Sequence, residues 1–460
     1  MVLPGVHFSF PSGSLFQFPP ASEPATLPTA SSSFPYAPPF SIPSSVYNHL
    51  LSPVYPATIS VLYLSAVISM NKYNRSHDRK PWSISQTRPF FWGVVLHNFL
   101  LALYSAWSLV GMITAVKHTW PGLYGKDGLV GAVDSMCKLH GPRGLGDAIT
   151  YNTTTNSWSA ASQAIKLVDT ALPDSTDVGR LWNEGLAFYG WIFYVSKYYE
   201  VLDTVIVLAK GKTSSVLQTY HHAGAILCVW AGIRYMSPPI WMFVMVNSGI
   251  HMMMYTYYTL SAFSLPIPVA IKRTITTLQI VQFLVGASYA ALHLFISYDS
   301  PVSVPYTIVS SVTAAASSVT SAAASAATSA SIGGWLKKFA LRAAGEEGLA
   351  ENVPGAGDLH VLEGLVNTTA ETGWRTELRT VPCIDTSGEA FAIWLNVLYL
   401  APLTYLFSSF FARSYSRRSA AKEKSKSSDK VSTTWEKAGV DALKGVDREL
   451  NETPVPERSS

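Results

Sequence analysis

Charged side chains are scarce in this chain of 460 residues, because Asp, Glu, Lys and Arg together make up only 13% of it. Soluble globular proteins contain about 25% charged residues. The formal net charge is +4, and the excess positive charge lies in short basic runs. Such runs between apolar segments are typical of membrane orientation and argue against a nucleic-acid partner. The composition therefore predicts a membrane protein.

Signals that would assign other classes of protein are also missing. The N-terminal residues show no basic segment followed by an apolar segment, so we expect no cleaved signal peptide. The final residues do not form a Lys-Asp-Glu-Leu-type retention signal. No internal repeat relates the two halves of the chain, which argues against a transporter built from repeats.

The two ends of the chain differ in composition from its middle. Residues 1–47 are rich in Pro and Ser and almost without charge, and we expect a disordered extension there. Residues 416–460 are rich in charged side chains, and we expect a cytoplasmic tail. Residues 48–415 therefore contain the expected folded domain.

Apolar segments recur through this domain, each close to the roughly 20 residues that a membrane-spanning helix needs. We therefore predict an all-α membrane protein with about seven transmembrane helices. A long loop insertion, residues 298–389, precedes the last helix. The expected spans are residues 55–70, 90–115, 186–209, 216–235, 240–263, 275–297 and 390–411.

Lys and Arg residues gather in the loops after the first, third and fifth spans and after the seventh. Short loops rich in these residues remain on the cytoplasmic side of a membrane. The C-terminus is therefore expected in the cytoplasm, and the N-terminus and the long loops 116–185 and 298–389 on the opposite side. Glycosylation sequons at Asn152 and Asn367, one in each long loop, agree with this orientation.

The chain has only three cysteines, and their positions differ in kind. Cys137 and Cys383 lie one in each long loop, whereas Cys228 lies inside the fourth span. Because an oxidising lumen lets cysteines pair, we predict a disulfide between Cys137 and Cys383. The alternative, in which both are unpaired or bond elsewhere, stays open because sequence does not fix connectivity.

Three polar clusters interrupt the third, fourth and fifth spans. Ionisable side chains at membrane depth are expensive and usually face a bundle interior or a water-filled cavity. The members of each cluster share one helical face, at about 100° per residue. Three helices with one polar stripe each predict a common chamber. The clusters are Lys197, Glu200, Asp203 and Thr204; Gln218, His221 and His222; and Asn247, His251, Met254 and Tyr258.

The imidazoles of this chamber favour one of two chemistries. A neutral imidazole is a nucleophile and a proton shuttle near neutral pH. Glu200 or Asp203 would then fix its tautomer, as the third group of a catalytic triad does. Gln218, Gln279 and Gln282 would donate hydrogen bonds to a developing oxyanion.

The second chemistry is metal binding by the histidines. Three convergent histidines can hold one zinc ion with an open position, as in a metal-dependent lipid-modifying enzyme. A di-iron oxygenase would need more histidines, and His97 and His293 lie in separate, less clustered stretches. A seven-helix receptor, the non-enzymatic alternative, would not need carboxylates and imidazoles gathered on its middle helices.

Four ordered motifs resemble those of the very-long-chain fatty acid elongases. They are Lys-x-x-Glu-x-x-Asp-Thr at 197–204, His-His at 221–222, Asn-x-x-x-His-x-x-Met-Tyr at 247–255 and Thr-x-x-Gln-x-x-Gln at 276–282. The resemblance covers roughly residues 45–418 and is specific, because the four motifs occur in order at coherent spacing. Many members of that family have His-x-x-His-His where this chain has Gln218 in the first position. Position 218 is therefore expected to form hydrogen bonds rather than to act as an essential base.

The resemblance implies a barrel of seven helices around an acyl tunnel, in the endoplasmic reticulum membrane with a luminal N-terminus. It implies a very-long-chain 3-oxoacyl-CoA synthase, which condenses acyl-CoA with malonyl-CoA and releases CO₂ and CoA. The two substrates would be its only small molecules, with no metal and no other cofactor. Its expected partners are the ketoacyl-CoA reductase, dehydratase and enoyl reductase of the elongation cycle.

The resemblance also implies roles for individual residues. His221 would attack the thioester carbonyl and form an acyl-imidazole, with His251 sharing the acyl group or assisting proton transfer. The alternative is direct condensation, in which His222 or His251 only stabilises an enolate. The expected catalytic residues are His221, His222, His251, Asp203 and Glu200.

Substrate-binding residues are expected beside the catalytic ones and at the cytoplasmic helix ends. Lys212, Lys272 and Arg273 would hold the CoA phosphates. Membrane topology alone also explains a lysine in such a loop, and an ion pair between Lys197 and Glu200 could be purely structural. The other expected substrate-binding residues are Lys197, Thr204, Gln218, Asn247, Tyr255, Tyr258, Gln279 and Gln282.

Overall fold

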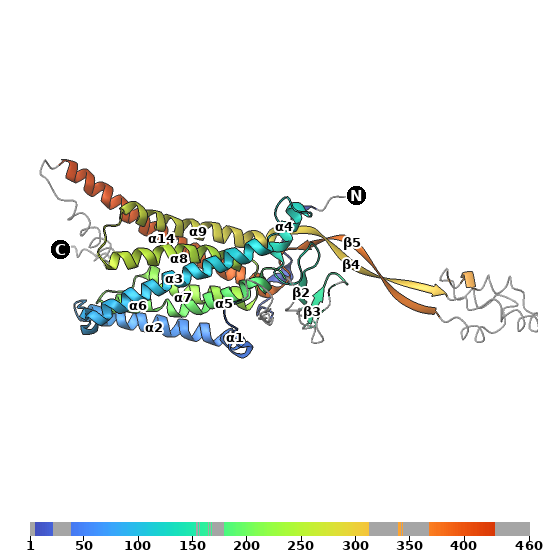
Figure 1. Cartoon of the computed structure of the whole chain (residues 1–460), viewed down its shortest axis with the longest axis horizontal. Coiled ribbons are helices and arrows are strands. Elements are labelled where there is room, and N and C mark those ends of the chain that lie inside the picture. Colours follow the sequence, from blue (N-terminus) through green and yellow to red (C-terminus); the bar gives the residue numbers. More distant parts are fainter. Residues whose placement is uncertain are drawn as a thin grey trace, which may run out of the picture. The chain divides into compact units, whose positions relative to one another are not determined.

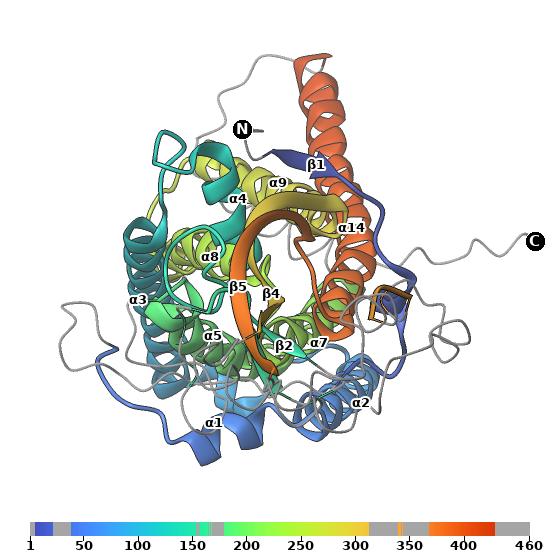
Figure 2. The same cartoon turned by 90° about the vertical axis from the view of Figure 1, so that its right-hand side faces the viewer.

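Long helices dominate the computed structural model, which describes residues 5–21, 38–152, 157–163, 179–311, 339–341 and 368–427 and a few single positions between these ranges. Figures 1 and 2 show the long helices side by side in one bundle. The helices of the bundle are α2 (Val54–Ser76), α3 (Arg88–Thr119), α5 (Ala187–Tyr199) with the short α6 (Leu202–Ala209) after it, α7 (Val216–Arg234), α8 (Ile240–Ala262), α9 (Val269–Leu292) and α14 (Ser387–Ser427). Two shorter helices are α1 (Ser44–Leu50) and α4 (Gly128–Cys137).

The bundle is held by contacts between helices that are distant in sequence. Helix α3 packs against α8, α14 packs against α9 and α7, and α2 packs against α7. Helix α5 contacts α3, α7 and α8, so it lies among the helices that carry the polar clusters. The bundle belongs to a unit formed by Met1–Val302 and Leu378–Ser460, and Ser303–Glu377 form a second unit.

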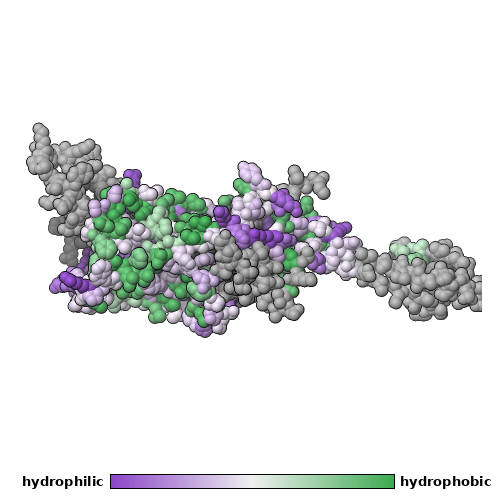
Figure 3. Space-filling model, viewed as in Figure 1, coloured by the Kyte–Doolittle hydropathy of each residue, from purple (hydrophilic) through white to green (hydrophobic). Residues whose placement is uncertain are grey.

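Helical structure occupies every one of the expected spans. Four helices in the described part of the chain are long and apolar enough to cross a membrane, namely Val54–Ser76, Arg88–Thr119, Val269–Phe295 and Ser387–Ala412. They expose large hydrophobic side chains such as Leu96, Leu284 and Leu398, and hydrophobic residues cover the bundle in Figure 3. Exposed apolar surface of this extent is the surface that lipid covers. The protein is therefore a mostly helical multi-pass membrane protein.

The turn that positions α7 is built by polar side chains of α2. The amide of Asn74 donates to the carbonyl oxygens of Leu208 and Lys212, both at 2.8 Å. Gly211 adopts a φ of +75°, and a Cβ there would lie 2.3 Å from the carbonyl oxygen of Arg79. The basic loops after α2 and α6 therefore pack directly on each other. Ser215 then caps α7, because its hydroxyl accepts a hydrogen bond from the backbone N–H of Gln218 at 3.2 Å.

Strands occur at the other end of the bundle helices. Strand β1 (Val6–Phe8) pairs antiparallel with β4 (Ile296–Ser311), and the sheet order is β1-β4-β5, with β5 at Thr368–Pro382. Strands β2 (Ile149–Asn152) and β3 (Ser157–Ala160) form a separate hairpin. The predicted loop insertion therefore begins and ends in a β-ribbon.

Two expectations about the chain ends need correction. The predicted disordered extension 1–47 contains strand β1, a 3₁₀ turn at Gly13–Phe16 and the start of α1. Pairing with β4 satisfies backbone groups of β1, and the Phe16 ring packs 5.9 Å from that of Trp394. Helix α14 continues past the expected boundary at residue 415 to Ser427, through a stretch of Ala, Lys, Arg and Glu that favours helix. The Ser/Ala/Thr-rich part of the insertion and the rest of the tail lie outside the described residues.

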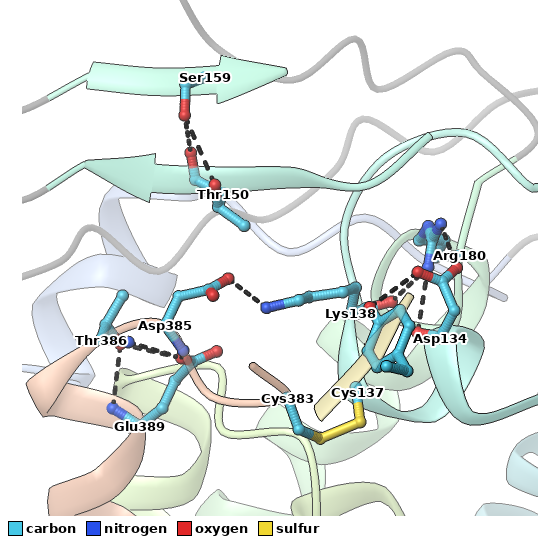
Figure 4. A network of polar contacts seen from close by, with 11 residues as sticks. Asp134, Cys137, Lys138, Thr150, Ser159, Arg180, Cys383, Asp385, Thr386 and Glu389 are labelled. Carbon is cyan, nitrogen blue, oxygen red and sulfur yellow. Dashed lines mark hydrogen bonds and ion pairs between the residues drawn. A yellow bond between two sulfur atoms is a disulfide. The ribbon is translucent and has the colours of Figure 1, made fainter. Parts of the chain in front are cut away.

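A disulfide and buried charges tie the first long loop to the start of α14 (Figure 4). Cys137, at the end of α4, is bonded to Cys383, 246 residues later, which is the pairing that the loop positions predict. Next to it, the Lys138 ammonium pairs with the Asp385 carboxylate. Arg180 and Asp134 form an ion pair of 2.7 Å with both side chains 3% exposed. The carboxylate of Asp134 also accepts from the Tyr298 hydroxyl at 2.8 Å.

Replacing Arg180 with methionine is expected to lower the free energy of unfolding by about 3–5 kcal/mol, because a buried carboxylate loses its partner. The loss also removes donors to the carbonyl oxygens of Pro142, Lys138 and Gly144. Thermal unfolding in detergent measures the effect. The control is Arg375→Met, which breaks an ion pair with Glu377 whose arginine is 65% exposed. Such a pair contributes about 0–1 kcal/mol, so equal losses in both variants would contradict the prediction.

Candidate active site in the helical bundle

The three polar clusters meet inside the bundle. His221 and His222 come from α7, His251 from α8, and Lys197 and Glu200 from α5 and its C-terminus. Hydrogen bonds of 3.2 Å join the first cluster to the other two, from Gln218 to Thr204 and from Lys197 to Asn247, and the His221 and His222 rings lie 5.5 Å apart. His222 and His251 are buried, and His221 is half-buried. The three polar clusters are therefore in contact inside the bundle, while the convergence of His221 and His251 on one substrate stays a prediction.

A buried ion pair at the end of α5 is joined to α8 by a hydrogen bond. The Lys197 ammonium donates to Glu200 Oε1 at 2.7 Å, and both side chains are buried. The ammonium also donates to the Asn247 side-chain oxygen at 3.2 Å, and Ser196 donates to Glu200 Oε1 at 3.2 Å. His251 Nδ1 lies 3.8 Å from the same carboxylate oxygen, which is close enough for attraction but too long for a hydrogen bond.

Asp203 has a different set of partners from the expected one. Its Oδ1 lies 2.8 Å from Nε2 of His97, and its Oδ2 accepts from the Tyr255 hydroxyl at 2.6 Å. The expectation that Asp203 fixes the tautomer of a clustered histidine is therefore wrong in this geometry. The helix is interrupted between Tyr199 and Leu202, so the polar face of α5 does not continue unchanged into α6. His97, which the sequence places outside the clusters, is in fact part of this network.

Gln218 forms a hydrogen bond to a neighbouring hydroxyl, in keeping with the expectation for this position. Its amide donates to Thr204 Oγ1 at 3.2 Å. The Thr204 hydroxyl also shares a 3.0 Å hydrogen bond with Tyr63 of α2. The ring of Tyr63 lies 6.2 Å from that of His222. Helix α2 therefore closes one side of the site through Tyr63, which the motifs do not include.

The opposite side of the site is closed by α14. The hydroxyl of Tyr399 lies 2.8 Å from Nδ1 of His221, and it donates to the His221 carbonyl oxygen at 3.1 Å. Tyr399 escaped the sequence analysis because a tyrosine in an apolar span is ordinary packing. Its role depends on α14 returning beside α7, which no local pattern shows.

Helix α9 contributes the predicted glutamines. Gln282 is buried, and its side-chain oxygen has no hydrogen-bond partner among the described residues. Gln279 donates to the Met254 sulfur at 3.5 Å. The ring of Tyr258 lies 6.1 Å from that of Tyr255. A buried acceptor without a partner is costly, so Gln282 has capacity for a ligand group.

The predicted phosphate-binding cations lie at helix ends rather than among the imidazoles. Lys212 lies in the turn between α6 and α7, and Lys272 and Arg273 lie in the first turns of α9. The turn containing Lys212 packs on the basic loop after α2. Their positions fit a polyanion bound at one end of the bundle, outside the imidazole site.

Imidazole, carboxylate and amide side chains buried in a multi-pass helical bundle mark a functional site. The model of the ELO (GNS1/SUR4) family matches residues 49–423. The chain belongs to this family, which confirms the resemblance seen in the four motifs.

Three curated relatives carry elongase names. Very long chain fatty acid elongase 3 of Homo sapiens is 34% identical over 110 residues, covering 24% of this chain and 41% of that protein. Fatty acid elongase sre1 of Dictyostelium discoideum is 38% identical over 116 residues, covering 25% and 42%. Fatty acid elongase 2 of Trypanosoma brucei brucei is 30% identical over 135 residues, covering 28% and 49%. The matches thus span less than half the length of each relative.

Proposed function

We propose that this protein is a fatty acid elongase that condenses an acyl-CoA with malonyl-CoA to a 3-ketoacyl-CoA, CO₂ and CoA. The proposal rests on the hydrogen bonds that join the three polar clusters, from Lys197 to Asn247 and from Gln218 to Thr204, beside the histidines of α7 and α8. Acyl transfer inside a membrane needs a nucleophile that is shielded from water, because water would hydrolyse the acyl intermediate. The family and the elongase names of the relatives support the same reaction.

The first stage transfers the acyl group to the enzyme. Nε2 of His221 attacks the thioester carbonyl, an N–acyl bond forms, and the C–S bond breaks. The CoA thiolate takes up the proton that the imidazole gives up, so the products are a neutral acyl-imidazole and CoA. The buried side-chain oxygen of Gln282, which has no hydrogen-bond partner among the described residues, is a candidate acceptor for a group of the substrate.

The second stage forms the new carbon–carbon bond. Malonyl-CoA loses CO₂, and the resulting enolate attacks the acyl carbon while the bond to Nε2 breaks. The imidazole then takes one proton from solvent and returns to its starting state. His251 stabilises the enolate, and Glu200, at 3.8 Å from its Nδ1, orients the ring and balances its charge. No electron is transferred overall, so the proposed reaction needs no redox cofactor, and we propose that it uses no metal.

The membrane setting of the reaction forms part of the proposal. The seven helical segments enclose the acyl chain, and the CoA moiety binds at the end that carries Lys212, Lys272 and Arg273. The basic loops face the cytoplasmic side of the endoplasmic reticulum membrane, and the N-terminus and the disulfide lie on its luminal side. The 3-ketoacyl product then requires a reductase, a dehydratase and an enoyl reductase, which are the proposed partners.

Membranes that contain the protein are expected to convert acyl-CoA and labelled malonyl-CoA to an acyl product longer by the labelled two-carbon unit. Mass spectrometry of the products from a panel of acyl-CoAs measures both the activity and the preferred chain length. Membranes without the protein, and reactions without malonyl-CoA, are the controls. The proposal would be contradicted if the protein bound acyl-CoA without malonyl-CoA but gave no extended product with any acyl-CoA of the panel.

A further inference from the structure

We propose that Tyr399 is a positioning residue that fixes the tautomer of His221 and leaves Nε2 of that ring as the unprotonated, nucleophilic nitrogen. The inference rests on the proposed function, since it assigns the means by which His221 becomes the acyl acceptor. Tyr399 belongs to none of the four motifs. It lies on α14, 178 residues after His221 in the sequence.

The argument is a count of protons at one hydroxyl group. A tyrosine hydroxyl has a single proton to donate and can accept on its oxygen. The Tyr399 hydroxyl lies within hydrogen-bond distance of two atoms of His221, the carbonyl oxygen at 3.1 Å and Nδ1 at 2.8 Å. A carbonyl oxygen can only accept, so it takes the tyrosine proton. Both hydrogen bonds form together only when Nδ1 donates to the hydroxyl oxygen, and in that neutral ring Nε2 carries the lone pair.

The packing around Tyr399 fixes this hydroxyl in place. The rings of Tyr220 and Tyr399 stack at 5.5 Å, and the Tyr220 hydroxyl donates to the Tyr399 carbonyl oxygen at 3.2 Å. On the same helix, Gly224 leaves the space in which the Tyr399 ring lies, because a Cβ there would be 2.2 Å from Cε2 of that ring. Helix α7 therefore holds Tyr399 through Tyr220, His221 and Gly224, which are consecutive or one turn apart.

The tautomer matters in the acylation step. When Nε2 bonds to the acyl carbon and the C–S bond breaks, the ring becomes positively charged and its remaining proton is on Nδ1. The hydrogen bond from Nδ1 to the Tyr399 oxygen stabilises that charge until the proton reaches the departing CoA thiolate. With the other tautomer, Nε2 would carry the proton and the lone pair would point at Tyr399, away from the substrate.

Replacing Tyr399 with phenylalanine is expected to lower kcat by about 10–100-fold with little change in KM for acyl-CoA, as for other groups that orient a catalytic histidine. Steady-state kinetics measure this split. In addition, ¹⁵N NMR of histidine-labelled protein should show His221 protonated at Nδ1 in the wild type and a mixture of tautomers in Tyr399→Phe. If Tyr399 had a purely structural role, Tyr399→Phe would lower the amount of folded protein. The kcat and the His221 tautomer of the folded fraction would then stay unchanged.

Two further variants make the test specific. Tyr220→Phe removes the hydrogen bond to the Tyr399 carbonyl oxygen but keeps the stacked ring and the Tyr399 hydroxyl, so it should change kcat and the tautomer far less than Tyr399→Phe does. Gly224→Ala keeps the Tyr399 hydroxyl but displaces its ring, so it should reproduce the effects of Tyr399→Phe. An unchanged kcat and an unchanged tautomer in Tyr399→Phe would overturn the inference, whereas absence of elongation by the wild type would instead overturn the proposed function.

Discussion

Replacing His221 with alanine is expected to reduce the formation of extended product by about 10³-fold or more, because the variant lacks the proposed acyl acceptor. The half-buried ring lies beside His222, and its Nδ1 lies 2.8 Å from the Tyr399 hydroxyl. Extended product is measured with labelled malonyl-CoA. The matched control is His77→Ala, since His77 is exposed and its hydrogen bonds go to Tyr73 and Ser76 in its own helix turn.

A trapping experiment tests the intermediate that this prediction requires. Wild-type protein incubated with labelled acyl-CoA alone should release about one CoA per active site and carry the acyl label on His221. The His221→Ala variant should do neither, although its thermal stability should stay near that of the wild type. Extension without prior CoA release, and without label on any histidine, would favour direct condensation in a ternary complex over the two-stage mechanism.

The sequence predicted the helices that carry the site because each has a local signature. Lys197, Glu200, His221 and His251 are ionisable groups in apolar segments, and such groups are costly unless they face a protein interior. Helical periodicity then places them on defined faces. The disulfide between Cys137 and Cys383 was predictable for a similar reason, since the two cysteines lie in the two long loops on the same predicted side.

The partners of these groups were less predictable because they depend on tertiary packing. Asp203 shares a helical face with Glu200 by spacing, yet it binds His97 of α3 and Tyr255 of α8. Helix α5 ends at Tyr199 and α6 begins at Leu202, and no residue type in the sequence signals this break. Tyr63 and Tyr399 are ordinary aromatic residues of apolar helices until α2 and α14 pack beside α7.

Variants of the ion pair between Lys197 and Glu200 separate its contribution to stability from its contribution to catalysis. Either Lys197→Met or Glu200→Gln alone is expected to lower the free energy of unfolding, by about 3–5 kcal/mol for the lysine replacement, because a buried charge loses its partner. The double variant removes both charges from a site in which the two side chains are 4% and 3% exposed. It should therefore regain most of the stability lost in the single variants, as coupled buried residues do.

Elongation should not return with the stability of this double variant. His251 would still lack the carboxylate that lies 3.8 Å from its Nδ1, and Asn247 would lack the ammonium that it accepts from at 3.2 Å. We expect activity at least about 10-fold below the wild type, with thermal unfolding and product formation measured on the same preparations. Lys80→Met is the control, because its pair with Asp78 is 78% and 84% exposed and contributes about 0–1 kcal/mol. Full activity in the double variant would show that the pair only stabilises the fold and that His251 is oriented without it.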